Sequence, residues 1–316
     1  MQFRKYQRAA TRTDQNPRSG GQGRGPKAPK RSEVIPLLGL VGEVGGLVGE
    51  YKKLLRDGHT HRAFKDEVAE ELGDILWYVA NVATKFELGL DQIAQQNLTK
   101  TADRYLRSAR HQRLIDAHYA TDQRIPRTFE YEFKHRKVNG QRRLVLVDRA
   151  SGNEVGDSLT DNTYEDSGYR YHDIMHLTFA AMLGWSPVYR KLLRKRGLIA
   201  NRSGGRTADV EDGGRAQVIE EAIVAAAYAY ASKHRLLRGV EALDWKLLRL
   251  VRQLTEELEV ARFSAKDWND TLLHGFALWR ELRKKGGGIV RGSLSKRTIE
   301  VLSADNSTGR GLAARS

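Results

Sequence analysis

Apolar residues recur at helical spacing directly after the first thirty residues. Ser32 is a suitable helix N-cap, Pro36 falls in the first turn, and Asp57 with Gly58 ends the pattern. The apolar positions between them are Leu37, Leu40, Val41, Val44, Leu47, Val48, Tyr51 and Leu55. The pattern predicts one long helix whose apolar face packs inward.

Two more helices are predicted to follow. The second runs from about Ala63 to Leu88, where Gly89 breaks it, and the third runs from Asp91 to about Tyr119. A short helix near residues 3–12 precedes all three. This part of the chain is therefore expected to be a helical bundle.

The pattern changes to alternation after residue 128. Phe129, Tyr131 and Phe133 alternate with polar residues, and Asn139 and Gly140 form a turn, which predicts a β-hairpin. The segment near 286–302 predicts a second small hairpin. Helical spacing returns between the hairpins at 171–183, 187–196, 216–237, 242–260 and 267–285.

These elements predict a mainly α fold with a helical bundle, a second helical domain and two small hairpins. The expected parts are a short helix with a basic linker (1–32), a helical domain (33–120), a hairpin connector (121–165), a C-terminal helical domain (166–304) and a disordered tail (305–316).

The C-terminal domain is a candidate degenerate repeat of the first. Residues 184–194 resemble 46–56, and the helix with Glu220 and Glu221 resembles the one with Glu70 and Glu71. Chance similarity between two amphipathic helical segments is the alternative.

Composition places limits on function. The 316 residues contain no cysteine, so a metal would need carboxylate, histidine or substrate ligands. No apolar stretch is expected to cross a bilayer, and no secretory signal is recognised, so we expect a cytoplasmic protein. The net charge of +15 suits partners that carry phosphates.

Positive charge is concentrated at the N-terminus. Residues 1–32 contain nine basic side chains and one acid, Asp14. Such a tail is either a solvated arm or a nucleic-acid contact, and it lacks the interleaved aromatic residues that stack on bases.

Acidic residues interrupt the apolar faces of the first two long helices. Glu43 and Glu50 are seven residues apart, close to two full turns, and Glu71 and Asp74 share a face of the second helix. If the helices form an antiparallel hairpin, these acids converge and would repel one another unless a cation lies between them. Oxygen ligands favour Mg²⁺ or Mn²⁺. The alternative is a solvated face on which each acid pairs with a nearby lysine.

The motifs on these helices resemble a known family. GLVGEVGGLVGEYKK, EELGDILWYVANVA and NLTKTADRY are similar to the consecutive helices of MazG-type all-α nucleoside triphosphate (NTP) pyrophosphohydrolases, over about residues 33–107. The resemblance implies that Glu43, Glu71 and Asp74 bind Mg²⁺ or Mn²⁺. One acid of the family pattern is absent, because Gly46 stands in its place. Glu50, as ligand or general base, or Glu67 from the opposite helix could complete the site.

The same resemblance implies a reaction and further site residues. Water would attack between the α and β phosphates of an NTP, giving a nucleoside monophosphate and pyrophosphate. Lys53, Asn97, Lys100 and Arg104 would contact the phosphates. Trp77 could stack on a base, although an aromatic residue at helical spacing is more often part of the core. Implied partners are NTPs and a homo-oligomer, or an intrachain pseudo-dimer.

Two further features are open to more than one interpretation. His172 and His176 lie four residues apart on one helical face and could bind a metal together with Glu220 and Glu221, or form hydrogen bonds within the core. The function of the protein is also open to two interpretations. It is either an enzyme of nucleotide-pool cleaning or phage defence, or a nucleotide-sensing or nucleic-acid-binding module that does not turn over its ligand.

Overall fold

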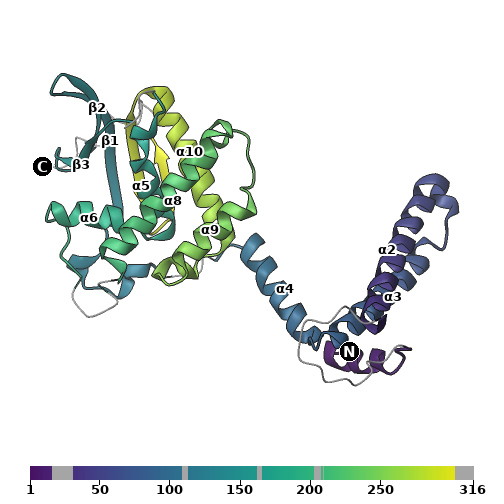
Figure 1. The fold of residues 1–316 in the computed structure, drawn as a ribbon. Helices are drawn as coiled ribbons and strands as arrows, with labels where there is room; N and C mark the ends of the chain where they lie inside the picture. Colours follow the sequence, from purple (N-terminus) through teal and green to yellow (C-terminus); the bar gives the residue numbers. More distant parts are fainter. Residues whose placement is uncertain (16–30, 109–112, 162–165, 203–207, 209, 303–316) are drawn as a thin grey trace, which may run out of the picture. The chain divides into compact units, whose positions relative to one another are not determined.

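The computed structural model describes residues 1–15, 31–108, 113–161, 166–202, 208 and 210–302 (Figure 1). The basic linker and the C-terminal tail predicted from the sequence fall almost entirely outside these residues. The chain divides into two compact units, Met1–Thr101 and Ala102–Ser316. Helices predominate in the described residues, as predicted.

The N-terminal unit consists of α1 (Phe3–Thr11), α2 (Arg31–Asp57), a 3₁₀ turn η1 (Gly58–Thr60), α3 (Phe64–Lys85) and the first turns of α4 (Leu90–Tyr105). Helices α2 and α3 pack as an antiparallel hairpin, since Gly39 lies against Tyr78 and Gly46 against Glu71. Its small core contains Ala10, Ala80, Ala83 and Leu90.

Helix α1 is fixed to the turn between α3 and α4 by Gln7. Its side-chain amide donates to the carbonyl oxygen of Leu88 (2.8 Å), and its amide oxygen accepts from the backbone N–H of Leu90 (3.0 Å). These bonds satisfy backbone groups at the start of α4.

Two helix ends differ from the sequence prediction. Helix α3 ends at Lys85, three residues early, because Glu87 adopts a left-handed conformation (φ 58°). The third helix was predicted to reach Tyr119, but α4 ends at Tyr105. The chain then leaves helical geometry, and the backbone N–H of Ser108 donates to Asp267 (3.0 Å).

The apolar face of α2 is exposed in the described chain, in contrast to the inward packing predicted. Val41, Val48 and Leu55 are 69%, 63% and 82% exposed. Ser32–Thr60 is also long and apolar enough to cross a membrane, which corrects the prediction that no stretch reaches that length. Length and composition alone are weak evidence for a span, and Glu43 and Glu50 in its middle would be costly in a bilayer.

The C-terminal unit contains one five-stranded antiparallel sheet in the order β3-β2-β1-β4-β5. The strands are β1 (Thr128–Val138), β2 (Gln141–Asp148), β3 (Glu154–Leu159), β4 (Gly288–Ser293) and β5 (Thr298–Val301). Both predicted hairpins are present, with Asn139 and Gly140 at the first turn (φ 50° and 79°). Pairing of β1 with β4 joins them, so the connector predicted as a separate part belongs to this unit.

Helices cover this sheet and complete the core. They are α5 (Asp173–Leu183), α6 (Pro187–Lys195), α8 (Gly214–Ser232), α9 (Trp245–Thr255) and α10 (Ala265–Lys285), with 3₁₀ turns η3 (Ile115–His118), η4 (Thr121–Gln123), η5 (Tyr169–Tyr171), η6 (Arg235–Leu237) and η7 (Glu259–Arg262). Helices α5 and α10 contact each other and the β4–β5 hairpin (Figure 1). The fully buried side chains include Phe179, Phe263, Trp268, Phe276 and Trp279.

The repeat hypothesis gains no support from local conformation. Helix α2 continues through Gly46, whereas Gly184, its counterpart in the proposed match, is left-handed (φ 67°) and ends α5. The two stretches therefore differ in backbone structure, and duplication stays a hypothesis.

Candidate metal and phosphate sites

The α2–α3 hairpin brings the acids of the N-terminal unit together. Gly39 against Tyr78 and Gly46 against Glu71 set the register of the two helices, and the same register places Glu43 level with Asp74. Glu43 and Glu71 are half-buried and Asp74 is exposed. The convergence predicted from the spacing is therefore consistent with the packing of the helices.

Glu71 is the centre of this cluster. Burial raises the pKa of its carboxyl, and the negative charges of Glu43, Glu50 and Asp74 raise it further. Its Oε2 is buried and has no hydrogen-bond partner within the described residues. A carboxylate oxygen that is buried, unpartnered and surrounded by other acids fits the environment of a cation ligand.

Glu50 occupies a different environment. Only 4% of the residue is exposed, and its two oxygens contact Lys53 Nζ (2.5 Å) and His61 Nε2 (2.9 Å). The hydrogen bond from Lys53 lowers the pKa of the Glu50 carboxyl, against the effect of burial. Glu50 is thus held ionised by its own partners. Sequence reasoning missed His61, although its place in the loop between the helices was a usable signal.

The acids do not form a closed ligand shell in this structure. Among the described residues, three ligand atoms lie within 4.8 Å of one another at His172, His176 and Glu221, and not at Glu43, Glu50, Glu71 and Asp74. Any divalent ion held by the α2–α3 acids would therefore take part of its coordination from water or from substrate phosphates, as is usual for Mg²⁺.

The predicted phosphate ligands are distributed between the two units. Lys53 is on α2, where its hydrogen bond to Glu50 raises the pKa of its ammonium and the negative charges of Glu67 and Glu71 raise it further. Asn97 and Lys100 lie on an exposed face of α4. Arg104 belongs to the C-terminal unit, where its guanidinium lies 5.1 Å from the centre of the Trp245 ring.

Trp77, a candidate for base stacking, is engaged in the packing of α1 on α3. Its indole N–H donates to Thr13 Oγ1 (2.7 Å), and the ring packs on the small core of the N-terminal unit. These contacts support the interpretation of Trp77 as a core residue.

The two histidines predicted to share a helical face do lie together, beside α8. Their ring centres are 5.8 Å apart, and His176 Nε2 is 3.6 Å from Glu221 Oε1. Glu220 is fully buried and accepts hydrogen bonds from Ser186 Oγ (2.6 Å) and the Val188 N–H (2.7 Å). It also contacts His176 Nδ1 at 2.8 Å. Burial alone would lower the pKa of His176, but Glu220 and Glu221 raise it to about 10.

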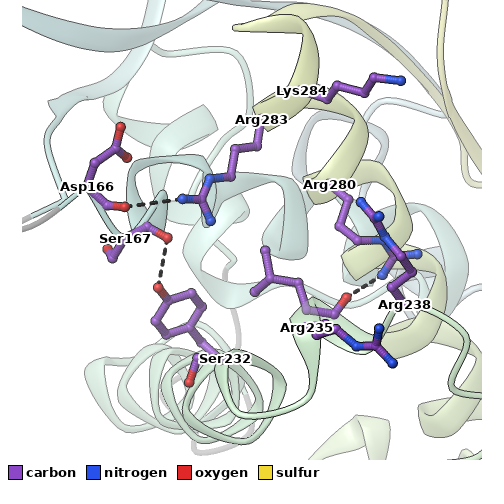
Figure 2. Close-up of a pocket in the computed structure, with 10 residues that line it drawn as sticks. Asp166, Ser167, Ser232, Arg235, Arg238, Arg280, Arg283 and Lys284 are labelled. Carbon is purple, nitrogen blue, oxygen red and sulfur yellow. Dashed lines mark hydrogen bonds between the residues drawn. The ribbon is translucent and has the colours of Figure 1, made fainter.

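A cavity of about 660 Å³ opens near one end of α8 (Figure 2). Five basic side chains line it: Arg235, Arg238, Arg280, Arg283 and Lys284. The sequence did not single out this group, because its members come from η6, the loop that follows it and α10, which only the tertiary structure brings together.

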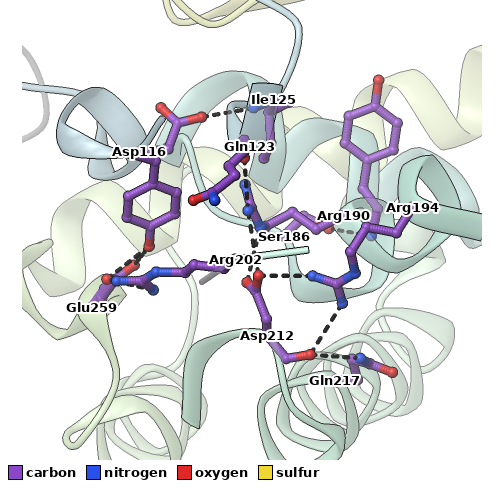
Figure 3. A network of polar contacts seen from close by, with 12 residues as sticks. Asp116, Gln123, Ile125, Ser186, Arg190, Arg194, Arg202, Asp212, Gln217 and Glu259 are labelled. Carbon is purple, nitrogen blue, oxygen red and sulfur yellow. Dashed lines mark hydrogen bonds and ion pairs between the residues drawn. The ribbon is translucent and has the colours of Figure 1, made fainter. Parts of the chain in front are cut away.

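The basic stretch at 190–196 has a structural role at two of its positions. Arg190 is buried and donates to Asp212 (3.0 Å) and to the Gln123 carbonyl (2.9 Å), while Arg194 pairs with Asp212 at 2.8 Å (Figure 3). Arg190 therefore belongs to the buried interior of its unit and not to a solvated basic face.

Fold and sites together define a mostly helical protein in which a carboxylate-bearing helix hairpin is joined to an α/β unit with its own His and Glu cluster. The chain belongs to the MazG C-terminal domain family, whose profile matches residues 110–305. This match supports a MazG-like assignment and, at the level of the family, a hydrolase of the nucleotide pyrophosphatase type. The matched residues do not include the motifs at 33–107, so the two resemblances are separate observations.

One curated relative has an uninformative name. The protein described as Gene 37 protein of Mycobacterium phage L5 is 41% identical to this chain over 69 residues, which are 21% of the chain. The chain spans about 60% of the length of that relative. No solved structure matches the chain.

Proposed function

We propose that the N-terminal unit is a metal-dependent NTP pyrophosphohydrolase that releases a nucleoside monophosphate and pyrophosphate. The observation that carries the proposal is the buried, unpartnered Oε2 of Glu71, which faces the acids Glu43, Glu50 and Asp74. Mutual repulsion of these acids is relieved when a divalent ion is bound. The family assignment is an independent reason to expect this class of hydrolase.

The residues of the cluster take distinct roles in this proposal. Glu43, Glu71 and Asp74 would hold Mg²⁺ or Mn²⁺, which would neutralise phosphate charge and orient the triphosphate when bound. Because Glu71 is a proposed metal ligand, Glu50 stays the candidate for the general base.

Glu50 would act through Lys53. Its ion pair keeps the lysine ammonium beside the acid cluster, where it can contact phosphate oxygens of the substrate. Asn97 and Lys100 on α4 are the further proposed phosphate contacts within the N-terminal unit, and Arg104 is proposed from the family motif alone.

A second copy of the chain is the proposed occupant of the exposed apolar face of α2. Val41, Val48 and Leu55 form part of an apolar stripe that water would otherwise solvate at a cost of about 25 cal/mol per Å². A Val41→Lys, Val48→Lys double variant should shift the mass measured by light scattering from dimer to monomer. If the chain forms an intrachain pseudo-dimer, the wild type and the double variant should both be monomers. If the wild type binds lipid vesicles and the double variant does not, the apolar face of α2 would instead be assigned to a membrane.

The enzymatic proposal is tested with purified protein, Mg²⁺ or Mn²⁺, and a panel of NTPs and dNTPs. Pyrophosphate release should fall by about 100-fold or more in Glu71→Gln. The matched control is Glu70→Gln, which changes the adjacent, exposed glutamate and should retain activity. Equal activity in the two variants would reject the site.

The alternative is a nucleotide-sensing or nucleic-acid-binding module without turnover. It is favoured by Gly46 and by the open arrangement of the acids, which lacks three ligand atoms within 4.8 Å of one another. Nucleotide binding by wild type that Glu71→Gln abolishes, with no pyrophosphate released by either protein, would support the sensor. Binding of oligonucleotides through the basic N-terminal tail would point to the nucleic-acid module.

A further inference from the structure

We infer that His172, His176 and Glu221 form a second metal site, in the C-terminal unit, selective for a transition metal ion such as Zn²⁺. One ligand atom from each residue lies within 4.8 Å of the other two, from η5–α5 on one side and α8 on the other. Two imidazole nitrogens and one carboxylate oxygen suit Zn²⁺ and its neighbours better than Mg²⁺.

The buried nitrogen of His176 is the strongest observation. Only 2% of His176 is exposed, and its Nε2 has no hydrogen-bond partner within the described part of the chain. Glu221 Oε1, at 3.6 Å, is beyond hydrogen-bond distance but placed to share an ion with this nitrogen. A buried polar atom left without a partner is costly unless something else satisfies it.

Each histidine is oriented by its other nitrogen. His176 Nδ1 contacts Glu220, which Ser186 and the Val188 N–H hold in place. His172 Nδ1 donates to the Tyr169 carbonyl oxygen (3.1 Å), which leaves Nε2 as its free acceptor. Carboxylate and carbonyl partners of this kind fix the tautomer and the ring orientation of metal-bound histidines. Glu220 is thus a positioning residue.

The site is open on one side. The side chain of Glu221 is 48% exposed and that of His172 is 14% exposed. Asp173 Oδ1 is 3.4 Å from His172 Nε2 and can adjust as a fourth ligand, or a water can complete the coordination. Three protein ligands with a free position are the arrangement found in catalytic zinc sites.

Metal binding by the full-length chain tests this site. Chelator-treated protein is titrated with Zn²⁺ against a chromophoric competitor and with Co²⁺ while its visible d–d bands are recorded. A Glu71→Gln, Asp74→Asn background removes the N-terminal acids from the measurement.

In this background, the protein with both histidines intact should bind one metal ion per chain. A further His172→Ala or Glu221→Gln change should weaken metal binding by about 100-fold or more. Glu220→Gln should weaken it by about 10–100-fold, the effect typical of residues behind a metal ligand. His234→Ala, at an exposed histidine on the turn after α8, is the control. Absence of a Co²⁺ spectrum, or equal metal affinity in His172→Ala and His234→Ala, would overturn the site. His176 would then be an imidazolium paired with two glutamates.

A separate observation carries a second inference: we propose that the cavity in Figure 2 binds a phosphate-bearing ligand. Its five basic side chains line a cavity of about 660 Å³. Burial and the positive charge of Arg238 lower the pKa of Arg280. The adjoining turn is strained, because Arg235, Leu236 and Leu237 all have left-handed φ values of 50–61°. Asp166 also lines the cavity, so the described lining carries an excess of positive charge and not positive charge alone. Strain and an excess of like charge tend to persist where a ligand compensates for them.

Charge-matched double variants test the cavity. Arg238→Gln with Lys284→Gln removes two lining cations, whereas Lys233→Gln with Lys246→Gln removes two exposed lysines outside it. Binding of pyrophosphate, ATP and a fluorescent single-stranded 12-mer is measured in EDTA, which keeps the metal sites empty.

Affinity should fall about tenfold in the lining variant alone, with a smaller salt dependence. Loss confined to the oligonucleotide would identify nucleic acid as the source of the phosphate, and loss for ATP or pyrophosphate would identify a small ligand. Equal affinities in the two double variants, or no binding by wild type, would reject the cavity as a site.

Discussion

Gly46 leaves the space that the carboxylate of Glu71 occupies. A Cβ atom at position 46 would lie 2.4 Å from both Glu71 oxygens, well inside van der Waals contact. The missing family acid and the half-buried Glu71 are therefore linked: a side chain at 46 and the present position of Glu71 exclude each other.

Gly46→Ala should separate stability from activity. Alanine in a helix interior is favoured over glycine by about 1 kcal/mol, but here it must displace the Glu71 carboxylate. We expect lower pyrophosphate release and weaker Mg²⁺ binding without loss of thermal stability. Gly49→Ala is the control, since a Cβ there meets no atom within 4 Å. Equal activity in both variants would contradict the link between Gly46 and Glu71.

Trp77→Phe should reveal whether the indole acts in packing or in base recognition. It removes the hydrogen bond to Thr13 and should lower the free energy of unfolding by about 1 kcal/mol, with KM for NTPs unchanged. Thr13→Val removes the same bond from the other side, together with the bond from the Thr13 hydroxyl to the Ala10 carbonyl oxygen, so the double variant should lose less stability than the sum of the two single losses. A several-fold rise in KM for Trp77→Phe alone would restore the stacking role.

Arg190→Met should strongly destabilise the C-terminal unit. Arg190 and Asp212 are both largely buried, and removing the arginine leaves Asp212 with Arg194 as its main ion-pair partner (Figure 3). Breaking a buried ion pair typically costs about 3–5 kcal/mol, and the remaining partner should reduce that figure. Lys191→Met, at an exposed position one residue on, should change stability by less than about 0.5 kcal/mol in urea unfolding. Similar midpoints for the two variants would show that the pair contributes little.

Glu211 should make stability fall as pH rises. Burial raises its pKa to about 7 from an ordinary 4.5, so the folded chain keeps a proton that the unfolded chain releases. This contribution is complete below about pH 4.5 and is lost as pH approaches 7, by at most about 3 kcal/mol. Glu211→Gln should remove this part of the pH dependence in urea unfolding from pH 4.5 to 8. The exposed Glu241→Gln should not, and a wild-type slope retained in Glu211→Gln would contradict the assignment.

Local pattern was sufficient where short-range forces decide the outcome. The helical spacing after Ser32, the break at Gly58, and the turn at Asn139 and Gly140 each correspond to an observed helix end or hairpin. The i, i+4 spacing of His172 and His176 likewise placed both rings on one side of a helix. In these cases the backbone periodicity alone fixes which side chains share a face.

Contacts between segments far apart in the chain could not be predicted from the local sequence pattern. Nothing local indicated that β1 would pair with β4, that Ser108 would leave the helix to bond Asp267, or that η6 and α10 would enclose five cations. The sequence by itself determined the helices, the hairpins and the faces that carry the acids. Only the tertiary structure decided that Oε2 of Glu71 is buried without a partner while Glu50 is buried and paired, because burial and charge pairing depend on which surfaces meet, and those surfaces belong to residues far apart in the chain.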